Sequence, residues 1–287
     1  MTGTAMCSER KDVLATSVDG CDVVWRSFGE GPATVLLHGG HGNWQHWARN
    51  IGPWSRTRRL LVPDMPGFGE SGAAPRADLP GLVEVLARSL AQLSPGRVDV
   101  VGFSFGALVA AHLATRDGRG DVEVGRLALL GPAGHGGPRR MARELLDWRR
   151  CPDPQSLAEA MRHNLAAFMI NNPAAIDGEA VAIHTRACRA TRFHSKSISR
   201  AGGLQQALAH FPGPVWMIWG EADVTMSPEA LAAIARDSRG TSADAAQVRV
   251  SVVPGAGHWV QYEAHARVNT LLQPWLQQSA GIPAQAG

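Results

Sequence analysis

The sequence predicts an α/β fold, in which helices flank a mostly parallel central sheet and a helical cap is inserted into the chain. Short apolar, β-branched runs alternate with longer segments of helical periodicity, and the runs end in clusters of Gly, Pro, Asp or Ser. One long central stretch lacks a strand signal. With 287 residues and a hydrophobic share of 45%, the chain can bury a large core.

The predicted strands begin with an antiparallel hairpin at the edge of the sheet. Asp12–Ser17 and Asp22–Ser27 flank Val18–Cys21, a segment that contains the turn-forming pair Asp-Gly. The later candidates form the parallel part of the sheet: Thr34–Leu37, Arg59–Val62, Val98–Gly102, Arg126–Leu130, Val215–Trp219 and Val248–Val253. Ligands of open α/β sheets bind beyond the carboxyl ends of the strands, so residues that follow these runs are the candidates for chemistry.

Helical periodicity predicts helices that follow strands, at Leu79–Leu93, Phe105–Thr115, Pro228–Asp237 and Ala264–Gln277. Between Gly134 and Phe211 the pattern is one of helical pieces that are interrupted by Pro and Gly. The predicted organisation is therefore an α/β core over residues 12–133 and 212–278, a helical cap over 134–211, and a flexible, small-residue tail over 279–287.

Charge and hydropathy limit the classes of partner. The formal net charge of +3 arises from 28 basic and 25 acidic residues without a dense Lys/Arg block, so we expect no nucleic-acid partner. Met1–Lys11 lacks the apolar stretch of a signal peptide, and no later run approaches the roughly 18 apolar residues of a membrane span. We expect a soluble, cytoplasmic protein without membrane association. The oligomeric state stays open, with a homo-oligomer among the alternatives.

Neither a metal nor another cofactor is expected. The four cysteines form no C-x-x-C pair and are predicted to be free thiols. His41 and His46 lie close in sequence, but no neighbouring carboxylate or cysteine completes a set of metal ligands.

Ser104 is the candidate nucleophile. It lies between Gly102 and Gly106, directly after a β-branched run and before a helical one, which is the context that a nucleophile elbow requires. Glycines at both positions allow strand and helix to approach closely while the serine adopts a strained conformation.

A serine hydroxyl needs a base, and the base needs a group that orients it. His258 follows the last predicted strand, and Asp223 follows the strand before it, so the chain order is Ser, Asp, His. Glu221 is the rival acid, although the spacing after the strand favours Asp223. We therefore predict a triad of Ser104, His258 and Asp223.

The glycine-rich segment Leu36–Gly42 is the candidate oxyanion loop. Without side chains, its backbone N–H groups can face a developing negative charge. An elbow nucleophile uses the N–H of the following residue together with one from this loop. The predicted donors are the N–H groups of Phe105 and Gly40.

From Val13 to Gln277 the chain resembles the α/β-hydrolase family. The resemblance is carried by five motifs: His38-Gly-Gly, Asp64-Met-Pro-Gly-Phe-Gly-Glu-Ser71, Gly102-Phe-Ser-Phe-Gly106, Gly220-Glu-Ala-Asp223 and Gly257-His-Trp259. It implies the α/β-hydrolase fold and serine hydrolase chemistry, with Asp64–Ser71 as a structural loop beside the site.

Within that family, the pair His258-Trp259 and the arginine-rich cap resemble the meta-cleavage product hydrolases, which cleave a carbon–carbon bond in vinylogous diketo acids. An arginine of the cap could bind a substrate carboxylate, and Arg192 is selected among many. His41 and Trp259 are the other candidates for substrate contact.

The expected function is hydrolysis of a small, apolar or aromatic carbonyl substrate: an ester, a lactone or the carbon–carbon bond of a vinylogous diketo acid. The expected partners are this substrate and water. Two alternatives stay open, namely cofactor-free peroxidase or lyase chemistry on the same triad and a non-catalytic ligand-binding homologue. Epoxide hydrolases and haloalkane dehalogenases are excluded because they need a carboxylate at the position of Ser104.

Overall fold

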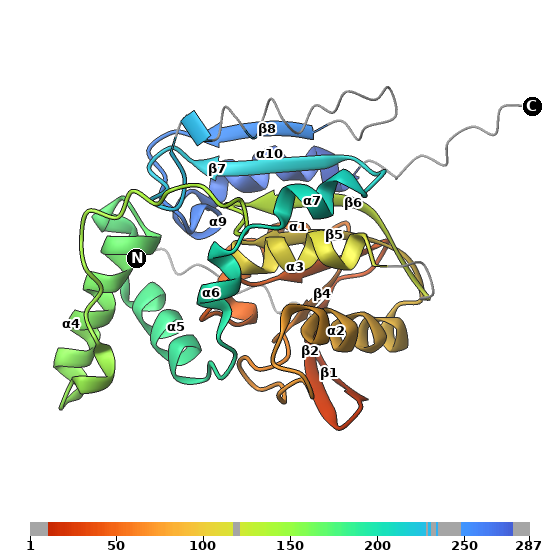
Figure 1. The fold of residues 1–287 in the computed structure, drawn as a ribbon, viewed down its shortest axis with the longest axis horizontal. Coiled ribbons are helices and arrows are strands. Elements are labelled where there is room, and N and C mark those ends of the chain that lie inside the picture. Colours follow the sequence, from red (N-terminus) through yellow and green to blue (C-terminus); the bar gives the residue numbers. More distant parts are fainter. Residues whose placement is uncertain (1–10, 117–120, 228, 231–233, 235–247, 278–287) are drawn as a thin grey trace, which may run out of the picture.

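The computed structural model describes residues 11–116, 121–227, 229–230, 234 and 248–277. Its centre is an eight-stranded sheet with helices on both faces (Figure 1). The strands are β1 (Lys11–Val18), β2 (Cys21–Phe28), β3 (Ala33–Leu37), β4 (Arg59–Pro63), β5 (Gly96–Phe103), β6 (Val122–Leu130), β7 (Val215–Gly220) and β8 (Val248–Val253). Most of the predicted helix Pro228–Asp237 and the tail over 279–287 lie outside the described residues.

The sheet has the order β1-β2-β4-β3-β5-β6-β7-β8. Strand β2 pairs antiparallel with β1 and with β4, and every other neighbouring pair is parallel. The mostly parallel sheet and the edge hairpin that the sequence predicts are therefore confirmed. Asp19 and Gly20 form the hairpin turn, with φ angles of 49° and 79°.

The longer helices of the core are α2 (Leu79–Leu93), α3 (Phe105–Ala114) and α10 (His265–Gln277). Their bounds agree closely with the prediction, because each carries apolar residues at helical spacing. Asp78 caps α2 by accepting a hydrogen bond from the backbone N–H of Gly81. Shorter elements complete the core: η1 (Trp44–Trp47), α1 (Ile51–Trp54) and α9 (Val260–Glu263).

The apolar side chains form two clusters, one on each face of the sheet. One cluster joins the sheet to α2 and α3, which lie in front of the strands in Figure 1. The other contains Trp47, Trp54 and Trp259 and joins the sheet to α1, α9 and α10. Side chains of successive strand residues point to opposite faces, so each buried strand contributes to both clusters.

The stretch from Gly134 to Phe211, here termed the cap segment, connects β6 to β7. Its elements are η2 (Trp148–Arg150), α4 (Pro154–Asn164), the π-helical turn η3 (Leu165–Met169), η4 (Pro173–Ala175), α5 (Gly178–Arg189), α6 (Ser195–Arg200) and α7 (Leu204–Ala209). In Figure 1, α4 and α5 lie at the side of the sheet, and α6 leads back to α3. Leu157 and Ile183 belong to the same apolar cluster as Trp259, so the cap segment packs directly on the core.

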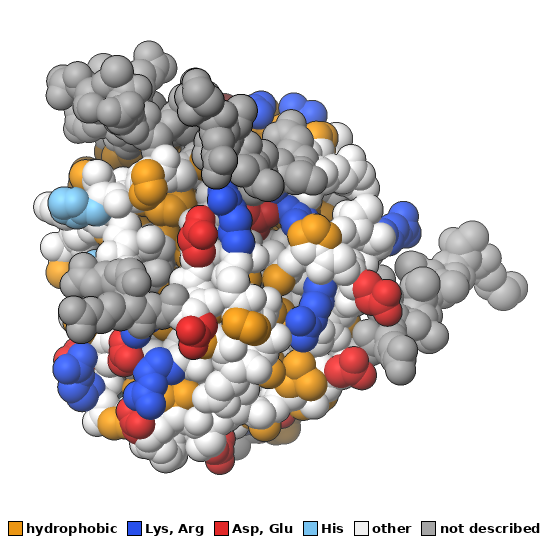
Figure 2. Space-filling model, turned by 90° about the vertical axis from the view of Figure 1, so that its right-hand side faces the viewer, with side chains coloured by type: hydrophobic (Ala, Val, Ile, Leu, Met, Phe, Trp, Pro, Cys, Tyr) orange, Lys and Arg blue, Asp and Glu red, His pale blue; other side chains and the backbone are white. Residues whose placement is uncertain are grey.

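Within the described ranges, no helix is long and apolar enough to cross a membrane. On the face shown in Figure 2, basic and acidic side chains are interspersed and no large field of one sign is visible.

Candidate active site

Three of the predicted site residues meet beyond the carboxyl ends of β5, β7 and β8. The Ser104 hydroxyl lies 2.9 Å from His258 Nε2, and His258 Nδ1 lies 2.8 Å from Asp223 Oδ2. Asp223 and His258 are almost completely buried, at 1% and 2% exposure, whereas Ser104 is partly accessible. The row of hydrogen bonds therefore runs from a buried carboxylate to a hydroxyl that a small molecule can reach.

Ser104 occupies a strained backbone conformation, with φ 52° and ψ −115°. A positive φ is unfavourable for a residue with a side chain, and it lifts the hydroxyl out of the line of the strand. A Cβ atom at Gly106 would collide with the carbonyl groups of Leu37 and His38, so glycine is required where α3 crosses β3.

Asp223 is held in its ionised form by its neighbours. Its Oδ1 accepts hydrogen bonds from the backbone N–H and the hydroxyl of Thr225, each at 2.7 Å. Burial alone raises the pKa of Asp223, but His258 and these hydrogen bonds outweigh it and lower the pKa below its usual value. The carboxylate thus accepts the Nδ1 proton of His258 and leaves Nε2 free to accept from Ser104. The rival acid Glu221 instead accepts from the Gly255 N–H at 2.9 Å.

The predicted oxyanion donors are the backbone N–H groups of Gly40 and Phe105. Gly40 follows β3, and Phe105 is the first residue of α3. In the described part of the chain, neither of these two N–H groups has a hydrogen-bond partner. Both therefore retain a free donor, as an oxyanion site requires.

Two buried histidines hold the backbone of Gly39, the residue that precedes Gly40. His38 Nδ1 donates to the Gly39 carbonyl at 2.8 Å, and His38 Nε2 accepts from the Met65 N–H at 3.0 Å. His46 Nδ1 accepts the Gly39 N–H at 3.2 Å. Burial lowers the pKa of both histidines, which keeps them neutral, as these bonds demand.

The loop Asp64–Ser71, which the family resemblance assigns a structural role, is tied together by one carboxylate. Asp64 accepts hydrogen bonds from Arg26 and from the backbone N–H groups of Trp44 and Glu70, at 2.9, 2.9 and 3.0 Å. Its oxygens are therefore occupied by protein groups.

The three predicted substrate-contact residues have different surroundings. His41 is partly exposed, and its pKa is lowered by burial and by the charges of Arg149, Lys196 and His194 in the cap segment. Trp259 is fully buried, and its indole N–H donates to the His46 carbonyl at 3.0 Å. The Arg192 guanidinium donates to the carbonyl of Ser71 and, at 3.0 Å, to that of Ala190. Trp259 and Arg192 are thus engaged with the protein itself.

The structure adds two residues that the sequence analysis did not single out. Thr225 fixes the Asp223 carboxylate, as described above, and a hydroxyl residue two positions after an aspartate is a local signal for such a turn. Phe168, in the π-helical turn, lies edge-on to His258 with 5.2 Å between the ring centroids. No local pattern marks Phe168, because the contact joins the cap segment to the core.

No group of three His, Cys, Asp or Glu side chains within the described ranges could hold a metal ion.

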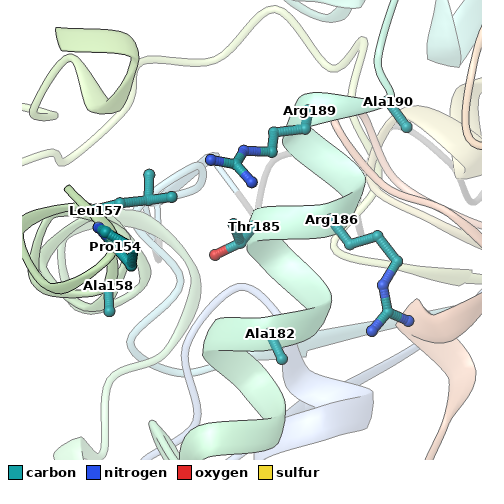
Figure 3. Close-up of a pocket in the computed structure, with 8 residues that line it drawn as sticks. All are labelled: Pro154, Leu157, Ala158, Ala182, Thr185, Arg186, Arg189 and Ala190. Atoms are coloured by element: carbon teal, nitrogen blue, oxygen red, sulfur yellow. The ribbon is translucent and has the colours of Figure 1, made fainter. Parts of the chain in front are cut away.

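A groove of about 570 Å³ lies between α4 and α5, where Arg189 turns toward Leu157 and Arg186 turns away (Figure 3). Arg186 donates to the Gln45 side chain at 2.6 Å. None of the predicted site residues lines this groove.

The profile of the alpha/beta hydrolase family matches residues 34–271. The chain therefore belongs to the alpha/beta hydrolase family.

Relatives of two kinds resemble the chain. A pimeloyl-acyl-carrier-protein methyl ester esterase of Nitrosospira multiformis is 29% identical over 72% of this chain and 82% of that protein. A 2-hydroxy-6-oxo-6-phenylhexa-2,4-dienoate hydrolase of Burkholderia cepacia is 34% identical over 38% of this chain and 39% of that protein. The chain spans about a third of the length of several curated relatives that it matches. The solved structure of an esterase from Rhodococcus sp. ECU1013 has a TM-score of 0.72 at 22% identity, over 96% of this chain and 100% of that one, and so shares the fold.

Proposed function

We propose that the protein is a serine hydrolase that uses Ser104, His258 and Asp223 to cleave a small carbonyl substrate. The observation that carries this proposal is the continuous row of hydrogen bonds from the Ser104 hydroxyl through His258 to Asp223, at 2.9 and 2.8 Å. The positive φ of Ser104 supports it, because strain of this kind persists where function requires it.

In the first half of the reaction, Ser104 Oγ attacks the substrate carbonyl carbon while its proton moves to His258 Nε2. The negative charge that develops on the carbonyl oxygen is stabilised by the N–H groups of Gly40 and Phe105. Asp223 stabilises the imidazolium form of His258. The tetrahedral intermediate then collapses, and His258 returns its proton to the leaving group.

In the second half, a water molecule replaces the leaving group. His258 removes a proton from the water, whose oxygen attacks the acyl carbon that is bound to Ser104. Collapse of the second tetrahedral intermediate releases the carboxylic acid and restores the Ser104 hydroxyl. No step requires a group other than these side chains, the two backbone donors and water.

The cap segment, residues 134–211, is proposed as a subdomain that covers this site. His41, within the candidate oxyanion loop, is affected electrostatically by Arg149, Lys196 and His194 of the cap segment, and Phe168 packs on His258. These contacts suit a substrate of limited size, enclosed by apolar and cationic side chains.

The substrate bond is proposed as an ester, a lactone or the carbon–carbon bond of a vinylogous diketo acid. Relatives named as methyl ester esterases support the first, and a relative named as a 2-hydroxy-6-oxo-6-phenylhexa-2,4-dienoate hydrolase supports the last. Both reactions use attack on a carbonyl, so the same row of side chains serves either.

The decisive experiment measures hydrolysis of p-nitrophenyl esters and of vinylogous diketo acids by the wild type and by Ser104→Ala, with mass spectrometry after fluorophosphonate treatment. We expect the wild type to turn over at least one class and to gain the mass of the probe. Ser104→Ala should lose the label and about 10³-fold or more of kcat.

Wild-type turnover by Ser104→Ala would disprove the nucleophile. Labelling of the wild type at Ser104 without hydrolysis of any panel member would favour the alternative lyase or peroxidase chemistry. A wild type that is neither labelled nor active would favour a ligand-binding homologue.

A further inference from the structure

The cap segment places a buried serine against the candidate oxyanion loop. Ser195 is the first residue of α6 and is 2% exposed. A Cβ atom built on Gly40 would lie 2.5 Å from Ser195 Oγ and 3.7 Å from the Cβ atom of Phe105. The Ser195 hydroxyl therefore occupies the space that a side chain at position 40 would need, and Gly40 lies between the cap segment and the start of α3.

This hydroxyl has no partner in the protein. Within the described ranges, Ser195 Oγ neither donates nor accepts a hydrogen bond, whereas the Ser195 backbone N–H donates to the Phe193 carbonyl at 3.1 Å. Polar atoms of side chains as buried as this one are normally paired, because they have lost most of their contact with water. The hydroxyl is thus a donor that is available to a ligand.

The chain that leads into α6 is fixed on the core. The Gly67 carbonyl accepts the Phe193 N–H at 3.1 Å. The Phe193 ring is buried, and its centroid lies 5.7 Å from those of Phe68 and Phe105. Ser195 follows two residues later and is therefore held beside the start of α3.

The electrostatics of the oxyanion loop give the same placement. After burial, the charges of three cap residues lower the pKa of His41 further: Arg149, Lys196 and His194. Two of them flank Ser195 in the chain. The start of α6 thus lies beside this loop by an observation that is independent of the packing distances.

We propose that the Ser195 hydroxyl is a third donor to the oxyanion, beside the backbone N–H groups of Gly40 and Phe105. The inference rests on the proposed function and assigns a residue of the cap segment to that site. As Ser104 attacks, the carbonyl oxygen of the substrate gains negative charge, and Ser195 donates a hydrogen bond to it while keeping its proton. The cap segment then contributes to bond cleavage itself and not only to enclosure of the substrate.

Ser195→Ala tests the proposal, because it removes the hydroxyl and keeps the Cβ atom. With a p-nitrophenyl ester that the wild type hydrolyses, kcat should fall about tenfold or more while KM changes less than about twofold, since a hydrogen bond to an oxyanion is stronger than one to a neutral carbonyl. Ser197→Ala is the matched control, because Ser197 is exposed on the same helix, and it should behave as the wild type.

Two further readouts separate this role from a structural one. The midpoint of urea unfolding should not fall in Ser195→Ala, because the hydroxyl has no partner to lose in the free protein. The second-order rate constant for labelling of Ser104 by a fluorophosphonate should fall by about the same factor as kcat, because the phosphoryl oxygen of the probe takes the place of the oxyanion.

A double-mutant cycle tests the contact between the loop and α6. Gly40→Ala adds a Cβ atom 2.5 Å from Ser195 Oγ, which forces one of the two apart. The substitution should therefore lower kcat/KM much more in the wild type than in Ser195→Ala, which lacks the colliding oxygen. Equal decreases in both backgrounds would show that Ser195 Oγ does not lie against Gly40, and would overturn the proposal.

The proposal is also overturned if Ser195→Ala keeps the wild-type kcat and labelling rate, or if Ser197→Ala loses as much. A higher KM at unchanged kcat would assign the hydroxyl to substrate binding, and a lower kcat together with a lower urea midpoint would assign it a structural role. In each of these cases a wild type that is active and labelled leaves the proposed function intact. A wild type that is neither labelled nor active would contradict the proposed function, and this inference with it.

Discussion

At the scale of single residues, the backbone of Gly39 determines where the Gly40 N–H points, because the Gly39 carbonyl and the Gly40 N–H belong to one peptide unit. His38 donates to that carbonyl, and His46 accepts the Gly39 N–H of the preceding peptide unit, so Gly39 is held at both of its polar backbone groups. His46 Nε2 has no hydrogen-bond partner in the described part of the chain, which shows that the ring serves the loop through Nδ1 alone. The sequence analysis rejected His46 as a metal ligand and did not predict its bond to Gly39, because a bond to a backbone N–H leaves no pattern in the residue order.

The role of His46 can be tested with His46→Phe, which keeps an aromatic ring but removes the acceptor. The buried Gly39 N–H would be left unsatisfied, which costs about 2 kcal/mol, and the Gly40 donor would lose its support. We expect kcat for a p-nitrophenyl ester to fall about tenfold or more, together with a lower midpoint of urea unfolding. His46→Asn, whose side-chain oxygen can take the place of Nδ1, should recover part of kcat. Equal kcat in both variants would contradict this role.

At the scale of secondary structure, a buried charge cluster joins the strands at the end of the sheet opposite Ser104. Asp99 of β5 accepts hydrogen bonds from Arg58, directly before β4, and from Arg126 of β6. Arg126 also donates to the Trp275 carbonyl of α10 at 2.7 Å. The sequence predicted β5 from Val98 and β6 from Arg126, whereas these strands begin at Gly96 and Val122. Charged and glycine residues at the strand starts obscure the apolar pattern there.

Asp99→Asn should destabilise the protein strongly, because two buried guanidinium groups would lose their counter-charge. Removing one partner of a buried ionic cluster costs about 3–5 kcal/mol. Urea unfolding followed by circular dichroism measures this loss. Arg97 lies on the same strand as Asp99 and forms a half-exposed pair with Glu123 of β6. Arg97→Gln, which breaks this pair, should cost less than about 1 kcal/mol. Similar losses in both variants would show that Asp99 does not compensate the arginines.

At the scale of the whole molecule, buried neutral histidines connect stability to pH. Burial lowers the pKa of His38 and His46 below the usual 6.5, and the pKa of His112 and His135 changes in the same direction. In the unfolded chain these side chains bind protons below about pH 6.5, whereas in the folded protein they stay neutral to lower pH. The unfolded state is therefore favoured as the solution is acidified.

We expect the free energy of unfolding to decrease from pH 6.5 toward pH 4.5, by at most about 1.4 kcal/mol per histidine per pH unit. Asp223 affects stability at lower pH. Because its pKa in the folded protein is lowered below the usual 3.8, the ionised carboxylate stabilises the fold above about pH 3.8, and this contribution is lost as the pH falls through the lowered pKa. Urea titrations at several pH values check the slope. His46→Phe, which lacks one of the histidines, should show a shallower slope. A free energy of unfolding that increases on acidification would contradict the conclusion that these histidines stay neutral in the folded protein.

The sequence by itself determined the order of strands and helices, the bounds of α2, and the elbow that carries Ser104, because each follows from periodicity or from glycines at fixed positions. The spacing after the strand also favoured Asp223 over Glu221, and the structure gives the two acids different partners, since Glu221 bonds to Gly255 and Asp223 to His258. Only the tertiary structure decided that Thr225 fixes the Asp223 carboxylate and that His46 holds the Gly39 backbone. The partners in such contacts are set by packing and not by residue order alone.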